Sequence, residues 1–143
     1  MIKIERVAES SLVERSEKRQ EENRAVTVER DRRIAAGFSF NGHRFDFDAD
    51  SVANITGAGA SAGIAVALDA ELGDLRWADA DTDFVWITAD NMSVEMDANT
   101  CFEFSQAAMA HKRSHIFAAR ALKDLDELPA DWRADTHWPP VST

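Results

Sequence analysis

Polar and apolar residues divide the chain into a long polar opening and a more apolar remainder. From Arg6 to Ala36 there is no glycine or proline, and Glu, Arg, Ala, Lys and Gln dominate, which predicts a helix. Its middle, Glu14 to Arg24, is entirely polar, so no apolar stripe can hold it against a core. Such a helix either stands in solvent as a spacer or is held by a partner at its ends. Apolar residues at its start are the predicted partner-binding positions: Ile2, Ile4, Val7, Leu12 and Val13.

The segment from Phe38 to Phe47 has the clearest local pattern in the chain. Asn41-Gly42 lies between alternating residues and predicts a β-hairpin with a two-residue type I′ turn. This turn sets three cross-strand pairs: Phe38 with Phe45, Ser39 with Arg44, and Phe40 with His43. The pairing gathers aromatic side chains on one face: Phe38, Phe40, His43, Phe45 and Phe47. That face needs a cover, and the following segments are expected to supply it.

A helix is predicted from Asp50 or Ser51, as its cap, to about Leu68. Its centre, Gly57 to Gly63, has little side-chain bulk, and three glycines weaken a helix by about 1 kcal/mol each. Close backbone packing is the expected compensation. The alternative, a phosphate-binding loop, lacks the Lys-Ser/Thr pair of a P-loop and the spacing of a dinucleotide fingerprint.

A second hairpin and a last helix complete the predicted elements. The hairpin pairs residues 84–88 with 92–96 around Ala89-Asp90-Asn91. Thr100 and Glu103 form a capping box for a helix that continues to about Leu128, before Pro129. The sequence thus predicts an α+β fold of order α-ββ-α-ββ-α. We divide it into a docking segment (1–36), a compact domain (37–128) and an irregular aromatic arm (129–143).

The charge is unevenly distributed along the chain. Residues 1–36 carry 9 Lys/Arg and 8 Asp/Glu, or +1, and residues 37–143 carry 7 and 18, or −11, which sum to the net charge of −10. An acidic body repels phosphate backbones, so no nucleic-acid role is expected. No apolar run is long enough to span a membrane, and the start does not resemble a signal peptide, which predicts synthesis in the cytoplasm.

Two constellations have the spacing of metal ligands. His111 and His115 lie at i and i+4 of the last helix, but Lys112 stands where a metalloprotease has its glutamate. Asp79, Asp81 and Asp83 begin like a calcium loop, but Phe84 occupies the position that an EF-hand reserves for glycine. We expect a packing or surface role for the histidines and a solvated loop for the aspartates, with a looser cation site as the alternative.

No catalytic residue or cofactor is predicted. Cys101, the single cysteine, is expected to be a small buried hydrophobe rather than a nucleophile. The tryptophans offer a sugar-binding platform as an alternative use. Trp132 and Trp138 of the arm are expected to dock on this domain or on a neighbour, and they join the predicted partner-binding residues.

The string from Glu29 to Phe47 resembles an uncharacterised domain family found in bacteriophage and prophage tail proteins. Further similar segments are Ser51–Thr56, Phe84–Asn91 and His115–Asp124, and the resemblance covers about residues 26–128. The ending, Leu128–Pro139, is similar to versions from phages of marine alphaproteobacteria. The resemblance implies a tail-tip, baseplate or fibre-attachment protein of the virion, assembled in the host cytoplasm. It brings no catalytic residues with it.

This setting implies that the partners are other phage tail proteins, and that the chain forms a homo-oligomer, with a trimer as the natural expectation for a fibre-associated part. Two alternatives remain at this point. One is a tail-fibre assembly chaperone that is absent from the finished virion, and the other is an adhesin that binds host-surface glycans.

Overall fold

The computed structural model describes residues 2–140, without the side chains of residues 2–5 and 7. Over this range the fold has three helices, α1 (Ile2–Ala35), α2 (Ala49–Ala67) and α3 (Ala98–Lys123). Between them lie the strands β1 (Phe38–Phe40), β2 (His43–Phe45), β3 (Val85–Ile87) and β4 (Ser93–Glu95). A single 3-10 turn, η1 (Asp135–His137), interrupts the irregular arm. The predicted α+β fold and its order of elements are confirmed.

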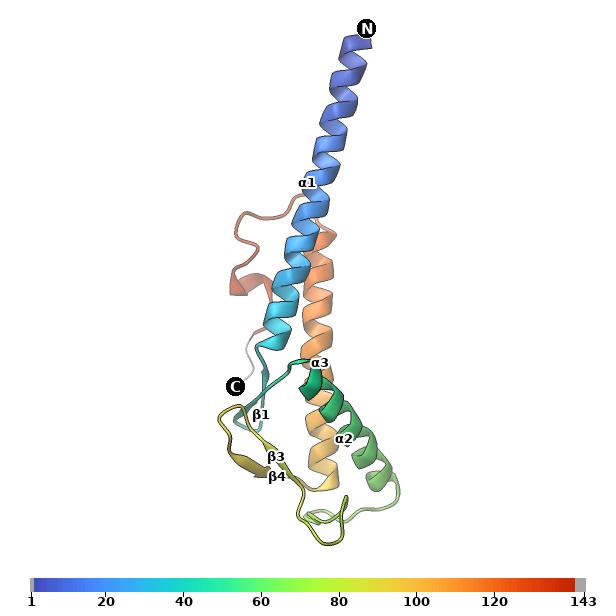
Figure 1. Ribbon diagram of the computed structural model, residues 1–143, viewed down its shortest axis with the longest axis vertical. Helices are drawn as coiled ribbons and strands as arrows, with labels where there is room; N and C mark the ends of the chain where they lie inside the picture. The colour runs from blue at the N-terminus through green and yellow to red at the C-terminus, as the bar shows by residue number, and fades with distance from the viewer. Residues whose placement is uncertain (1, 141–143) are drawn as a thin grey trace.

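Helix α3 is the scaffold of the molecule. Helix α2 packs along its N-terminal part, and the C-terminal half of α1 runs beside its C-terminal part (Figure 1). The two hairpins lie on the side of α3 where α1 ends, and the arm returns along α1 (Figure 1). The N-terminal half of α1 extends far beyond this body.

The first hairpin has the predicted register. Phe38 pairs with Phe45 and Phe40 with His43, and the turn residues Asn41 and Gly42 have φ angles of 48° and 79°. Two consecutive residues in the left-handed region define the type I′ turn that the Asn-Gly sequence favours. The hairpin remains a separate two-stranded sheet, joined to the second one by a hydrogen bond from Ala89 N to Arg44 O at 2.8 Å.

Phe104 of α3 occupies the centre of the main core. Its ring lies 4.7 Å from that of Phe45, 5.5 Å from that of Phe38 and 5.2 Å from that of Trp86. Both hairpins therefore converge on one buried side chain, as the predicted aromatic face requires. The buried members of this main core are Phe38, Phe45, Phe47, Ile55, Ala62, Met96, Cys101, Phe104 and Ala108.

The glycine-rich centre of α2 lets two helices approach closely. A Cβ atom added to Gly59 would lie 2.3 Å from the Cβ and Oγ atoms of Ser105 on α3. A methyl group cannot occupy that space, so the predicted close packing is confirmed at this glycine. Gly57, by contrast, faces open space.

Both later helices begin earlier than predicted. Asp48, not Asp50 or Ser51, caps α2 by accepting a hydrogen bond from Ser51 N at 3.1 Å. Asp97, not Thr100, caps α3, with Thr100 N donating at 2.7 Å. A carboxylate offers the same acceptor as a serine or threonine hydroxyl and also complements the positive end of the helix dipole.

A second core cluster joins α1, α3 and the arm. Its buried members are Val26, Ala119, Leu122, Trp132 and Trp138. The structure therefore moves the predicted division at residue 36 back along the chain: the second half of α1 belongs to the body. The arm (129–140) belongs to the body as well. Helix α3 ends at Lys123, a turn before the predicted end near Leu128.

Candidate functional site

The N-terminal half of α1 is the part of the chain with the least contact to the rest. From Leu12 to Lys18 every side chain is exposed, including Leu12 at 62% and Val13 at 54%. These two predicted partner-binding residues are thus presented to solvent. The side chains of Ile2, Ile4 and Val7 lie outside the described residues.

Arg19 is the residue at which α1 begins to form hydrogen bonds with the body. Its Nη2 atom donates to the carbonyl oxygens of Leu122, Lys123 and Leu125, at 3.3, 2.8 and 2.6 Å. These carbonyls belong to the last turn of α3 and the residues just after it, where no intrahelical donor remains. One side chain thereby caps α3 and anchors α1. About two turns of α1 further on, Lys123 Nζ donates to Thr27 Oγ1 at 2.6 Å.

The predicted partner contacts at Trp132 and Trp138 are corrected by the structure. Their exposed fractions are 6% and 5%, and Trp138 Nε1 donates to Trp132 O at 2.9 Å. Of the two docking alternatives, this chain's own body is the one that covers them. Trp77 and Trp86 are half-buried in the main core, so no tryptophan is left exposed as a sugar-binding platform among the described residues.

Arg33 fastens the arm to α1. Its Nη2 atom donates to Arg133 O at 2.7 Å and to Asp135 Oδ1 at 2.9 Å, and its guanidinium lies 5.2 Å from the Trp138 ring. Its Nε atom donates to Glu29 at 3.0 Å, and Arg32 binds the same carboxylate. Hydrogen bonds from Arg32 and Arg33 lower the pKa of Glu29, against the opposing effect of its burial.

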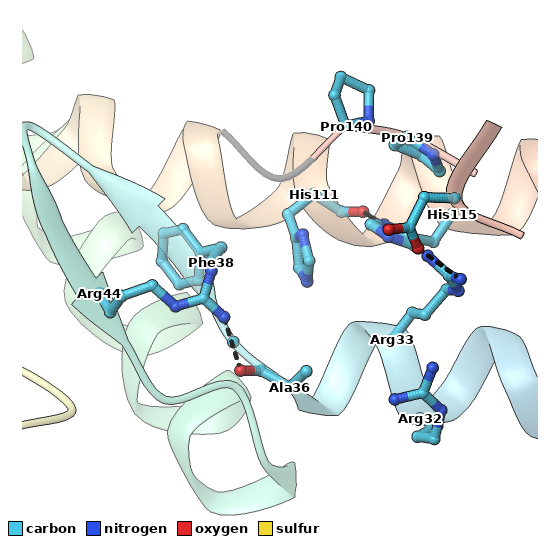
Figure 2. A pocket seen from close by; sticks show the side chains of 11 residues that line it. Arg32, Arg33, Ala36, Phe38, Arg44, His111, His115, Pro139 and Pro140 are labelled. Atoms are coloured by element: carbon cyan, nitrogen blue, oxygen red, sulfur yellow. Dashed lines mark hydrogen bonds and ion pairs between the residues drawn. The ribbon is translucent and has the colours of Figure 1, made fainter. Parts of the chain in front are cut away.

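A cavity of about 210 Å³ lies where the end of α1, the first hairpin, α3 and the arm meet (Figure 2). Arg44 reaches across it and donates to Ala36 O at 2.9 Å, at the negative end of the α1 dipole. Asp135 on the cavity wall, Glu29 beside Arg32 and Arg33, and that dipole partly balance the positive charges of the three arginines. Its other walls are Phe38, His111, His115, Pro139 and Pro140.

His111 and His115 link the two core clusters. The ring of His111 stacks 5.9 Å from Phe38, and its Nε2 donates to Ile34 O at 3.0 Å. His115 is buried, donates from Nδ1 to His111 O at 2.7 Å, and stacks 6.5 Å from Trp138. Burial, the neighbouring His115 and Arg44 lower the pKa of His111, while its hydrogen bond to Ile34 O opposes them. Among the described residues, no group of three or more His, Cys, Asp or Glu side chains is placed to hold a metal ion.

The acidic loop is a solvated turn. Asp79, Asp81 and Asp83 are all exposed, Asp79 accepts a hydrogen bond from Asp81 N at 2.9 Å, and Asp83 pairs with Arg76 at 3.1 Å. The Arg76 guanidinium partly neutralises the negative charge of this loop. The three carboxylates are not gathered into a metal site within the described part of the chain.

Cys101 is a core residue, as predicted. Its side chain is 0% exposed, and burial raises the pKa of its thiol to about 11. A thiol of this kind remains protonated at neutral pH and is a poor nucleophile.

Sequence reasoning missed the residues that tie α1 and the arm to α3. Arg19 and Arg33 look like any other charges in a polar helix, and Val26 looks like an isolated apolar residue. The signal that was present is the change along α1 itself: apolar residues return only at Ala25, after the all-polar stretch. That return marks the segment that packs on the body.

A family model described as "Domain of unknown function (DUF4376)" matches residues 17–137. The matched region starts two residues before Arg19 and ends one residue before Trp138, so it covers most of the body and leaves out most of the projecting half of α1. No curated protein and no solved structure matches the chain. No helix among the described residues is long and apolar enough to cross a membrane.

Proposed function

This chain belongs to the DUF4376 domain family, a domain of unknown function. We propose that it is a structural component of a bacteriophage tail that acts by protein–protein assembly. In this proposal it occupies the tail tip, the baseplate or a fibre attachment, and its partners are other tail proteins. The tail setting comes from the resemblance of the Glu29–Phe47 string and its companion segments to phage tail proteins.

The projecting half of α1 is the observation that carries the proposal. In proteins most of the stability of a helix comes from packing of its apolar side chains rather than from its own propensity. Up to Lys18, described side chains of this half are exposed apart from the half-buried Ser11, and the first anchor is Arg19. A partner that packs on Leu12 and Val13 would supply the missing support.

The position of the family match is consistent with a body common to the family and a projecting half of α1 that docks on a partner. The match begins at residue 17, so the common body and the projecting segment meet near Arg19. A shared body with a segment outside the shared region suits a component that uses that segment for one particular partner.

The test is removal of the projecting segment alone. Val26 and Arg19 belong to the body, so the truncation that separates docking from folding removes residues 1–16 and leaves both in place. We expect the truncated protein to keep the far-UV circular dichroism of its remaining helices and its cooperative unfolding, but to be missing from purified phage particles when it replaces the full chain.

A paired substitution supplies the matched control. Changing Leu12 and Val13 together to serine should reduce incorporation into particles, whereas Val28→Ser should not, although Val28 is on the same helix and is 69% exposed. Incorporation of the truncated protein at the level of the full chain would contradict the proposal. Mass spectrometry of the same particles distinguishes a virion component from an assembly chaperone, which would be absent even as the full chain.

A further inference from the structure

Helix α2 is exposed along one whole side, yet that side carries almost no charge. Between Asp50 and Asp69 the sequence has no Asp, Glu, Lys, Arg or His, in a chain of which 29% is charged. Ile55, Gly59 and Ala62 form the side buried against α3. On the opposite side the exposed residues follow helical spacing, and we call them the α2 outer face: Ala53, Gly57, Ala60, Ser61, Ile64 and Leu68.

The α2 outer face includes large apolar side chains as well as small ones. Ile64 is 64% and Leu68 77% exposed, and Leu72, just beyond the helix, is 80% exposed. On one flank, Val85 and Ile87 of β3 line the same hollow as Ser51 and Asn54 of α2, and both are exposed apolar residues. Exposed apolar side chains that gather on one side of a helix are typical of an interaction site.

We propose that the α2 outer face binds the same face of a second copy of this chain. A two-fold interface brings a surface against itself, so a surface with a net charge meets the same net charge. Residues 37–143 carry 18 acidic and 7 basic residues, and a second copy approaching most faces of the body meets repulsion. The α2 outer face offers an approach that avoids this repulsion.

The sizes of the side chains along the helix agree with an antiparallel pair. The small residues Ala53 and Gly57 lie in its N-terminal half and the large residues Ile64 and Leu68 in its C-terminal half. A two-fold axis between Ala60 and Ser61 places Ile64 of one copy opposite Gly57 of the other. It also places Leu68 opposite Ala53. Each large side chain then meets a small one, and the two helix dipoles oppose each other favourably.

Other occupants fit this face less well. A basic partner would be drawn to the acidic surfaces elsewhere on the body and would gain no electrostatic attraction here. A membrane surface, which is anionic, repels a body with this charge, and α2 is not long and apolar enough to cross one. The pair is two-fold, and in this respect it differs from the trimer expected from the tail-fibre setting.

The pairing is independent of the proposed docking of α1, and one set of variants of the full chain tests it. Multi-angle light scattering should show a rise in mass towards twice 15.9 kDa between about 1 and about 200 µM, the range of micromolar affinities. Ile64→Glu should weaken the pair at least tenfold, because it places an unpaired charge in the interface. The double change of Leu12 and Val13 to serine should leave the pair unchanged, whatever its effect on docking.

Cysteine cross-linking tests the position of the axis. Cys101 is fully buried, so an introduced surface cysteine supplies the reactive thiol. Ala60→Cys should form a disulfide-linked dimer under mild oxidation. Phe117→Cys, at a position on α3 that is 64% exposed, should not. A wild-type protein that stays monomeric throughout this range, or equal cross-linking of the two variants, would overturn the proposal. So would an Ile64→Glu variant that is folded by circular dichroism and associates like the wild type.

Discussion

Gly57 and Gly59 offer a matched pair of substitutions with different expected effects on stability. Both are interior positions of α2, and at an interior position alanine favours the helix over glycine by about 1 kcal/mol. Gly57→Ala places its methyl group in open space, so we expect it to stabilise the fold by about that amount. Its unfolding should be measured at low protein concentration, so that the result reports the fold and not association through the α2 outer face.

Gly59→Ala gains the same helix propensity but meets α3. The new Cβ would lie 2.3 Å from the Cβ of Ser105, whereas two carbon atoms in contact prefer about 3.5–4.0 Å. The helices must therefore separate by more than 1 Å at this point, and overpacking of this kind costs about 1–3 kcal/mol. Because the propensity gain cancels between the two variants, Gly59→Ala should be less stable than Gly57→Ala by that same amount.

Urea unfolding followed by circular dichroism measures both variants, and a second substitution identifies the cause. Ser105→Gly removes the Cβ and Oγ atoms that Gly59→Ala would strike, so Gly59→Ala should cost less in that background than in the wild type. Equal stabilities of Gly57→Ala and Gly59→Ala would refute the close approach of α2 to α3. So would an undiminished cost of Gly59→Ala in the Ser105→Gly background.

Three further predictions concern the side chains of Arg19, His111 and Cys101. Arg19→Met should lower the free energy of unfolding by about 1–2 kcal/mol, because α3 loses its cap. Lys18→Met, at a neighbouring side chain that is 80% exposed, should have little effect. Equal effects of the two variants in urea unfolding would contradict the capping role. Burial lowers the pKa of His111, so the unfolded state binds a proton at this side chain more readily than the folded state. The contribution of the neutral imidazole to stability is therefore present above about pH 6.5 and is lost as the pH falls below that value. His111→Gln, whose amide nitrogen can still donate to Ile34 O, should show a smaller fall in stability between about pH 7.5 and 5.5 than the wild type, and an unchanged fall would exclude His111 as its source. Cys101 should react with a thiol reagent at the rate of global unfolding, and rapid labelling of the native protein would contradict its burial.

Much of the local structure could be predicted because its causes are local. The Asn41-Gly42 turn sets the register of the first hairpin through its own backbone angles, and that register alone places the phenylalanines on one face. The helix starts were misplaced by two or three residues because Asp48 and Asp97 compete with equally suitable caps nearby. The residues next to Asp97 and Thr100 do not show which of the two caps α3. Asp97 accepts an additional hydrogen bond from Gly73 N, and that residue lies 24 positions away in the sequence.

Among the candidate sites, too, those with local causes were predicted and those that depend on distant residues were not. Exposure of Leu12 and Val13 followed from the all-polar stretch beside them, because a segment without an apolar stripe cannot be covered by its own domain. The assignment of Trp132 and Trp138 as partner contacts was wrong because the sequence alone does not show which surface an apolar arm covers. The surface they cover is built from Val26, Ala119 and Leu122, which belong to two distant helices.

The sequence by itself determined the elements of this protein, the register of the first hairpin, the uncharged run of α2 and the acidic body. These properties depend on neighbouring residues and on composition, which folding does not change. Tertiary structure alone decided where α1 stops being part of the body, because that point depends on Arg19 reaching carbonyls more than 100 residues away. It also decided which side of α2 is covered: Gly59 meets Ser105 and Gly57 meets solvent, although the two glycines are only two residues apart. A helix turns these positions to different sides, and only the placement of α3 determines which side is buried.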